Sequence, residues 1–246
     1  MNMKPFELTT DVPEELTAEQ RREQANARAR VGLVVFTLIL QMAAMLLFGF
    51  VTWSDWRTGF ALNLVQVAIF GTFAYLRMDR LMVHLIFFGL IVGVIQLNAG
   101  AWLVEYTGTL DYSIGGGPFL WRSPFWLIVA WQVIAIQFAV LGGWLWERWQ
   151  GAGLILTGLL GAMYLAFYEH LAYGADWWAY SGCSMVGRAP DYVILSEFFI
   201  VMAMAILYKV VEARRATETF KAGVLGGVDI LVCFAAAYSL WSVAGL

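Results

Sequence analysis

Long apolar runs dominate the chain, and short polar stretches separate them. A run of about 20 apolar residues is the length that an α-helix needs to cross the hydrocarbon core of a bilayer. Because the backbone cannot bond to water at that depth, each run is predicted to be a helix. We therefore predict an all-α bundle of seven membrane-spanning helices at residues 31–52, 58–76, 81–104, 124–146, 152–173, 190–211 and 223–244.

The first thirty residues follow a different pattern, "MNMKPFELTTDVPEELTAEQRREQANARAR". Charged residues are spread through this stretch, whereas a cleavable signal peptide has a short positive head followed directly by an apolar core. We predict an amphipathic helix that begins near Thr17 as its N-cap and runs into the first span. The chain then divides into a charged segment, 1–30, and one seven-helix transmembrane domain, 31–246.

Composition supports a membrane environment and excludes other classes. Of 246 residues, 61% are hydrophobic and 13% are charged, against roughly 45–50% and 25% in soluble domains. The net charge of −3 gives no basic footprint for nucleic acid. We expect an integral protein of a prokaryotic inner membrane, with membrane lipid as its surroundings.

Basic residues predict the orientation of the chain. If the N-terminus lies inside, only Arg57, Arg122 and Arg188 fall on the outer side. The other twelve lysines and arginines fall on the inner side. Because positive charge is retained on the cytoplasmic face, this arrangement predicts an inner N-terminus and an outer C-terminus.

The predicted outer loops are the long ones. "EYTGTLDYSIGGGPFLWRSP" and "GADWWAYSGCSMVGRAP" are rich in aromatic residues and glycine, whereas the inner connections "RMDR" and "ERWQG" are short. Long loops of this kind often carry function. The alternative is an aromatic belt at the depth of the lipid headgroups, where Trp and Tyr gather in any membrane protein.

Polar residues in the spans gather in the predicted outer half. Asn98, Trp102 and Glu105 share one helical face, and polar side chains at this depth are costly unless they are paired or face a cavity. We therefore predict an acidic and aromatic pocket there. Its candidate catalytic residues are Glu197, Glu169, Asp176, Asp191 and Glu105, and its candidate substrate-binding residues are Asn98, Trp102, Trp131, Gln132, Tyr173, Trp177 and Trp178.

Acids beside aromatic rings suit one class of reaction. A carboxylic acid in a medium of low dielectric constant tends to keep its proton, so it can protonate an alkene. The faces of Trp and Tyr rings then stabilise the carbocation. The alternative is that Glu169 and Glu197 satisfy each other, Asn98 or Gln132 by hydrogen bonding and simply lock the bundle.

Metal and cofactor chemistry is not predicted. The two histidines, His84 and His170, lie toward opposite ends of the bundle, so no ligand set forms at one depth. The last span has no lysine for a retinal Schiff base. Cys183 and Cys233 form neither a disulfide framework nor a metal-type pair.

Two stretches resemble a known group of enzymes. "ADWWAYSGCSMVGRAPDYVILSEFF" resembles the loop and following helix of membrane-embedded carotenoid cyclases of the heterodimeric lycopene cyclase type. "EYTGTLDYSIGGGPF" is similar to a loop of the related carotenoid hydratases. In the cyclases two acids follow the proline closely, whereas here Asp191 follows Pro190 and Glu197 stands six residues further on. The resemblance covers about a fifth of the chain and implies cofactor-independent cyclisation or hydration of an isoprenoid.

The competing interpretation is not enzymatic. An accessory subunit that binds pigments or lipids could scaffold a photosynthetic or respiratory complex. The small residues of "GLILTGLLGAM" would suit a partner helix. A transporter would show inverted repeats, and none is visible. A cavity shared by acids from different spans would favour the enzyme, whereas scattered acids and a free small-residue face would favour the scaffold.

Overall fold

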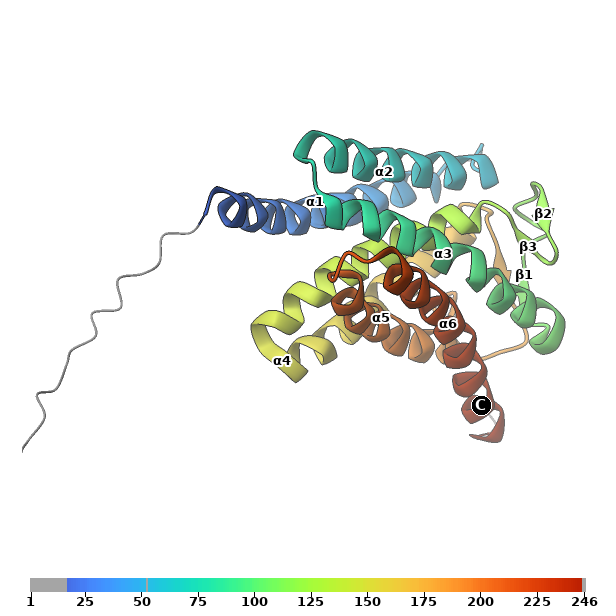
Figure 1. The fold of residues 1–246 in the computed structure, drawn as a ribbon. Coiled ribbons are helices and arrows are strands. Elements are labelled where there is room, and N and C mark those ends of the chain that lie inside the picture. Colours follow the sequence, from blue (N-terminus) through green and yellow to red (C-terminus); the bar gives the residue numbers. More distant parts are fainter. Residues whose placement is uncertain (1–16, 52, 245–246) are drawn as a thin grey trace, which may run out of the picture.

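The chain folds into long apolar helices. A computed structural model describes residues 17–51 and 53–244, and Figure 1 shows its helices packed into a bundle with one end closed by loops. Six helices within these residues are long and apolar enough to cross a membrane, so the architecture is that of a helical integral membrane protein. They are α1 (Ala18–Phe48), α2 (Trp56–Arg77), α3 (Arg80–Trp102), α4 (Leu127–Gly174), α5 (Asp191–Val211) and α6 (Ala216–Ala244).

Helix α1 begins where the sequence predicts. The Thr17 side chain accepts from the Gln20 amide at 3.2 Å, and the Gln20 side chain accepts from the Thr17 amide at 2.8 Å. This reciprocal pair satisfies two amides at the start of the helix. From there α1 runs without interruption to Phe48, so it ends before the predicted end of the first span. The part of the predicted segment 1–30 that precedes Thr17 lies outside the described residues.

Helix α4 is broken in its middle. Gln150 has φ 48° and ψ −130°, which is not helical. The rings of Phe138 and Tyr164 have centroids 5.9 Å apart, although 26 positions in a continuous helix would separate them by about 39 Å. The two halves of α4 therefore fold back against each other, as the two limbs near its label show in Figure 1. The break lies between the predicted spans 124–146 and 152–173.

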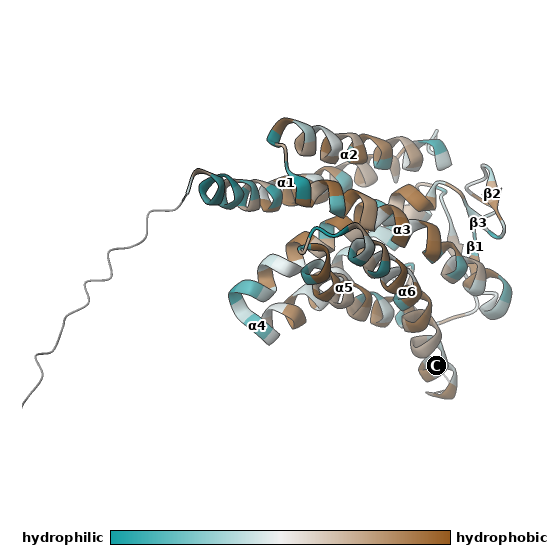
Figure 2. Cartoon of the chain, in the orientation of Figure 1, coloured by the Kyte–Doolittle hydropathy of each residue, from teal (hydrophilic) through white to brown (hydrophobic). Residues whose placement is uncertain are grey.

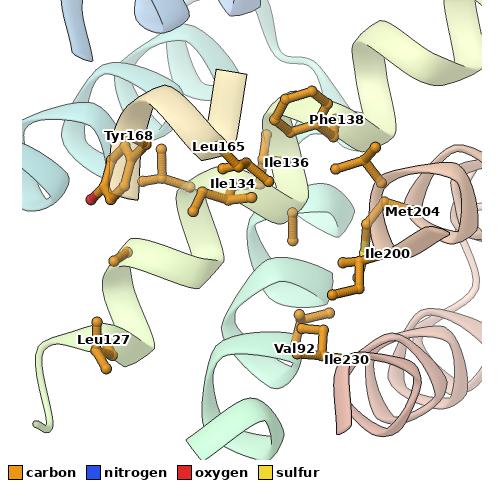
Figure 3. Packing of buried hydrophobic residues seen from close by; sticks show 14 of the residues in the cluster. Val92, Leu127, Ile134, Ile136, Phe138, Leu165, Tyr168, Ile200, Met204 and Ile230 are labelled. Carbon is orange, nitrogen blue, oxygen red and sulfur yellow. The ribbon is translucent and has the colours of Figure 1, made fainter. Parts of the chain in front are cut away.

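The core is apolar and lies between α3, both halves of α4, α5 and α6. Figure 3 shows Ile134, Phe138 and Leu165 from α4 with Ile200 from α5 and Val92 from α3 in this cluster. All five are buried. Figure 2 shows that apolar residues also colour much of the remaining helix surface, while hydrophilic residues gather toward helix ends and loops. This distribution fits helices whose outer faces contact lipid.

Short strands, absent from the all-α prediction, tie the two long loops together. β1 (Leu110–Asp111) pairs with β4 (Ala179–Tyr180), and the Ser181 amide donates to the Thr109 carbonyl at 2.9 Å. β2 (Phe119–Leu120) pairs with β3 (Ser123–Pro124), and β5 (Met185–Val186) pairs with β6 (Ala189–Pro190). A π-helical turn, η1 (Leu103–Thr107), continues α3 into the first loop. The loops thus form one cap.

An ion network joins the helices at the opposite, basic end. The guanidinium of Arg30 donates to both carboxylate oxygens of Asp79, at 3.0 and 3.2 Å, and to Glu23 at 3.0 Å. Arg214 pairs with the same Glu23 at 2.5 Å, and Lys209 pairs with Glu147. We call Glu23, Arg30, Asp79 and Arg214 the ionic clasp. Arg30 is only 2% exposed and Asp79 is also 2% exposed, so the pair is enclosed by protein.

Close helix packing makes one glycine indispensable. A Cβ atom at Gly93 in α3 would lie 2.0 Å from the carbonyl oxygen of Ile128 in α4. Since a backbone atom cannot rotate away, we expect Gly93→Ala to destabilise the protein by about 1–3 kcal/mol or more. The matched control is Gly71→Ala, because no atom lies within 4 Å of that position. Unfolding by SDS titration measures both variants, and equal midpoints would contradict the packing.

Candidate active site

Two of the predicted acids line one cavity. Glu169 comes from the second half of α4, and Glu197 comes from α5. Their shared cavity has a volume of about 30 Å³. Glu197 is 2% exposed, and its Oε2 atom has no hydrogen-bond partner within the described chain. The cavity is lined by Leu127, Ala130, Trp131, Ile134, Leu165, Tyr168, Glu169, Trp178 and Glu197.

Aromatic rings wall this cavity on the loop side. The Trp178 Nε1 group donates to Glu169 Oε2 at 2.5 Å. The Trp178 ring stacks between Trp126 and Tyr168, with centroid distances of 5.9 and 6.0 Å and interplanar angles of 28° to each. Because Trp126 and Trp178 are 1% and 6% exposed, the stack separates the acids from bulk water. Loop 175–190 therefore covers the cavity, and we call it the roof.

The surroundings of the acids are uncharged. Within the described chain, no lysine, arginine or histidine forms an ion pair with Glu169 or Glu197. Burial raises the pKa of the Tyr112 and Tyr180 hydroxyls, and the Glu169 carboxyl adds to the effect. These hydroxyls stay protonated and remain hydrogen-bond donors.

Glu105 lies at a different place. It pairs with Arg122 at 2.5 Å, and its side chain is 42% exposed. Together with Asn98 and Trp102 it lines an open groove of about 420 Å³ that also includes Tyr106. The rings of Trp102 and Tyr106 stack at 5.2 Å. The predicted face of Asn98, Trp102 and Glu105 therefore exists, but it borders this groove rather than the acid cavity.

The remaining predicted acids take part in loop structure. Asp191 accepts from the Ser184 hydroxyl at 2.5 Å at the start of α5. Asp176 is exposed and has φ 56°, a left-handed conformation in the turn after α4. Neither Asp176 nor Asp191 lines the cavity of Glu169 and Glu197.

The other predicted substrate-binding residues separate in the same way. Trp131 and Trp178 line the acid cavity. Gln132 instead donates to the Ile86 carbonyl at 3.0 Å, and thus faces α3. Trp177 is buried in the roof and donates to Thr58 at 3.1 Å. Tyr173 is 39% exposed and has the Arg188 guanidinium 4.1 Å above its ring.

Sequence reasoning assigned no role to a second polar group, which lies beside the acid cavity. Tyr168 lines the cavity directly. Behind it lie buried amides and a hydroxyl on α1, α2 and the first half of α4. Their spacing of three or four positions within α1 and α2 was the available signal. We call this set the amide cluster, and its members are Thr37, Gln41, Asn63, Gln66 and Gln137.

Among residues 17–51 and 53–244, no group of three or more His, Cys, Asp or Glu side chains could hold a metal ion. His84 bonds to Thr219 at 2.9 Å on the far side of the bundle. Cys183 and Cys233 are both free.

Comparison with known proteins places the chain in a family. Residues 97–241 match the family described as "Domain of unknown function (DUF6989)". Since the match covers more than half of the chain, the protein belongs to this family. No curated protein and no solved structure matches it. The matched region contains Glu169 and Glu197 and excludes α1 and α2, which carry part of the amide cluster.

Proposed function

We propose that this member of the DUF6989 family is a membrane-embedded, cofactor-independent enzyme that hydrates or cyclises an isoprenoid by protonating an alkene. The observation that carries the proposal is the single cavity shared by Glu169 and Glu197, which has aromatic walls and no basic residue bonded to either acid. Two carboxyl groups held close together cannot both ionise without a large penalty, and burial adds to it. At least one of them is therefore available as a proton donor.

The proposed reaction needs only the groups in this cavity. One carboxylic acid gives its proton to an alkene carbon, and the carbon–carbon double bond becomes a carbocation. The face of the Trp131 ring, which lines the cavity and is not part of the Trp126–Trp178–Tyr168 stack, stabilises this cation. In hydration, a water oxygen bonds to the cation and the other carboxylate accepts the released proton. In cyclisation, a second double bond of the substrate attacks the cation. The carboxylate that did not donate the first proton then accepts a proton from carbon.

The size of the cavity favours hydration. A volume of about 30 Å³ accommodates one or two water molecules but not an isoprenoid chain. A hydratase needs such a water beside its acid. The alkene end would then enter from the membrane past Trp131, which is only half-buried.

The scaffold alternative has one observation in its favour. An apolar groove of about 380 Å³ runs between α5 and α6, and it could hold a lipid or a pigment. The small-residue stretch that was expected to receive a partner helix is already occupied. Cβ atoms at Gly158 and Gly161 would meet Phe198 and Val201 of α5 at 2.6 and 2.3 Å. This stretch packs within the chain, and the proposal of an enzyme is the stronger one.

Pigment analysis in a polyene-producing host tests the choice between the two functions. If the chain is an enzyme, we expect a new hydroxylated or cyclised product with the native chain and none with Glu197→Gln. The scaffold predicts one unchanged pigment profile for both chains, together with co-purification with a large membrane complex.

We further propose that the chain crosses the membrane seven times, with its N-terminus inside. Support comes from the fold-back at Gln150, which turns α4 into two antiparallel limbs, and from the basic residues around the ionic clasp. The capped end, with the acid cavity beneath it, would then face outward.

Cysteine labelling tests this topology. In a chain carrying Cys183→Ser and Cys233→Ser, new cysteines are placed singly at two exposed loop positions, Ser181→Cys and Ala213→Cys. A membrane-impermeant maleimide applied to intact cells is expected to label the first and not the second, since the second lies at the basic end. The reverse pattern, or equal labelling of both, would contradict the proposed orientation.

A further inference from the structure

The amide cluster lies buried inside an apolar bundle. Thr37 and Gln41 come from α1, Asn63 and Gln66 from α2, and Gln137 from α4. All five side chains are 0% exposed. Polar residues in a membrane-embedded core are costly unless they are paired or hydrated. Three helices contribute to this one group, so it is a single feature and not scattered polarity.

The cluster is only partly bonded to itself. The Gln137 Nε2 group donates to Thr37 Oγ1 at 3.2 Å and to Gln66 Oε1 at 3.0 Å. The Asn63 Nδ2 group donates to the Gly59 carbonyl at 2.8 Å. These bonds fix the position of the amides but leave much of their bonding capacity unused.

Five buried amide atoms of the cluster have no protein partner in the described chain: both side-chain atoms of Gln41, Asn63 Oδ1, Gln66 Nε2 and Gln137 Oε1. Leaving a buried donor or acceptor unpaired costs free energy. Donors and acceptors are both present, and none of the five side chains carries a charge. Water is the ligand that satisfies such a mixture, because one molecule both donates and accepts and commonly makes about three bonds.

Tyr168 connects this cluster to the acids. Its ring lines the cavity that contains Glu169 and Glu197. Its hydroxyl faces the side-chain amides of Gln41 and Asn63, although it does not reach hydrogen-bond geometry with either. Tyr168 is 3% exposed, so no bulk water reaches this hydroxyl. A tyrosine hydroxyl accepts one proton while it donates another, and it can therefore pass a proton without becoming charged.

We propose that Tyr168 joins the acid cavity and the amide cluster into one hydrated relay, through which the Glu169–Glu197 pair exchanges protons with water bound among the amides. In each transfer a water O–H bond breaks, the Tyr168 oxygen gains that proton and its own proton moves to the next acceptor, so the hydroxyl is regenerated. The relay deepens the proposed function, because an acid catalyst must recover its proton after each turnover. It does not require that function, because exchange occurs with or without an isoprenoid.

Infrared spectroscopy of the full chain in lipid nanodiscs tests the relay. The carbonyl band of a protonated carboxyl group shifts when H₂O is replaced by D₂O, and its loss in Glu169→Gln or Glu197→Gln assigns the band. We expect Tyr168→Phe to slow the exchange of the Glu197 band at least tenfold, and Gln41→Leu to slow it in the same direction. The matched control is Tyr164→Phe, one helical turn away, whose hydroxyl bonds to the Leu38 carbonyl at 3.1 Å. That variant is expected to exchange at the native rate.

Three results would overturn the relay: native exchange in Tyr168→Phe, equal slowing in Tyr164→Phe, or no protonated carboxyl band that depends on Glu169 or Glu197. Folding is checked by thermal unfolding of each variant, and Tyr168→Phe is expected to fold because its hydroxyl has no protein partner. Pigment conversion is measured separately. If Tyr168→Phe slows exchange but the native chain converts no pigment, the relay is retained and the proposed function is rejected. If the native chain converts pigment but Tyr168→Phe exchanges at the native rate, the proposed function is retained and the relay is rejected.

Discussion

Glu197→Gln is expected to lower the yield of converted polyene by about 100- to 10,000-fold, the range over which a positioned acid contributes to catalysis. Gln keeps the shape of the side chain but cannot supply the proton. Glu197 is the fully enclosed member of the pair, and its Oε2 atom has no partner that the substitution would leave unpaired. The chain should therefore fold normally while the reaction stops. Chromatography of pigments from a lycopene-accumulating host measures the yield against equal amounts of membrane-bound protein.

A surface acid provides the control for this experiment. Glu218 pairs with Lys221 at 3.0 Å on the exposed side of α6, and Glu218→Gln should leave the yield within about twofold of the native chain. Glu105→Gln distinguishes the two candidate places. If Glu105→Gln abolished conversion while Glu197→Gln retained it, the reaction would belong to the open groove of Asn98, Trp102 and Glu105, and our assignment would be rejected.

Asp79→Ala is expected to destabilise the protein by about 3–5 kcal/mol, the usual cost of removing one partner from a buried ion pair. Arg30 would keep its charge in an enclosed site with only the half-buried Glu23 as a partner. Asp79 also caps α3, since its Oδ1 atom accepts from the Met82 amide at 3.0 Å, and loss of a cap adds about 1 kcal/mol. SDS titration of the purified protein in mixed micelles measures the free energy of unfolding.

Two further variants make this measurement decisive. Glu218→Ala removes an exposed pair and should change the free energy of unfolding by less than about 1 kcal/mol. The double variant Arg30→Met with Asp79→Ala removes both charges and should recover much of the loss, because no unpaired buried charge remains. If Asp79→Ala were no more destabilising than Glu218→Ala, the ionic clasp would not hold the basic end together.

The helices were predictable because one physical requirement dominates their sequence. Each apolar window had to satisfy its backbone internally. Within the described residues, each of the six membrane-length helices overlaps a predicted window, and α4 overlaps two, so seven separate spans are not confirmed. The break in α4 was also visible, since "ERWQG" interrupts the apolar pattern. Its conformation at Gln150 was not predictable, because no glycine or proline occupies the position that takes the positive φ. The loop strands escaped prediction because each is two residues long, and one pair, β1 with β4, joins two loops that are distant in the sequence.

The candidate site was only partly predictable because periodicity does not tell which face of a membrane helix is buried. Asn98, Trp102 and Glu105 do share a face, but that face borders an open groove. In a soluble protein the apolar face points inward, whereas lipid also accepts apolar residues on the outer faces. The expected depth of a residue in the membrane was the better guide to the site. Glu169 and Glu197 were both assigned to the predicted outer half, and they line one cavity.

The amide cluster shows that the depth of a residue in the membrane does not predict which residues of other helices it contacts. Gln41 and Gln137 lie on helices whose polar residues looked isolated in the sequence. The two partners of Gln137 are Thr37, 100 positions away along the chain, and Gln66, 71 positions away. Such pairs depend on how α1, α2 and α4 are arranged in space, and a single sequence contains no information on that arrangement beyond the polarity of each residue.

The most direct test of the central claim follows the proton itself. The purified protein is incubated with lycopene in lipid nanodiscs prepared in D₂O, and the product is examined by mass spectrometry. The account predicts one carbon-bound deuterium from solvent for each end of lycopene that the native chain converts, and no such product from Glu197→Gln. A product without carbon-bound deuterium, or equal deuterium incorporation by the native chain and Glu197→Gln, would contradict protonation of an alkene by the buried acid pair.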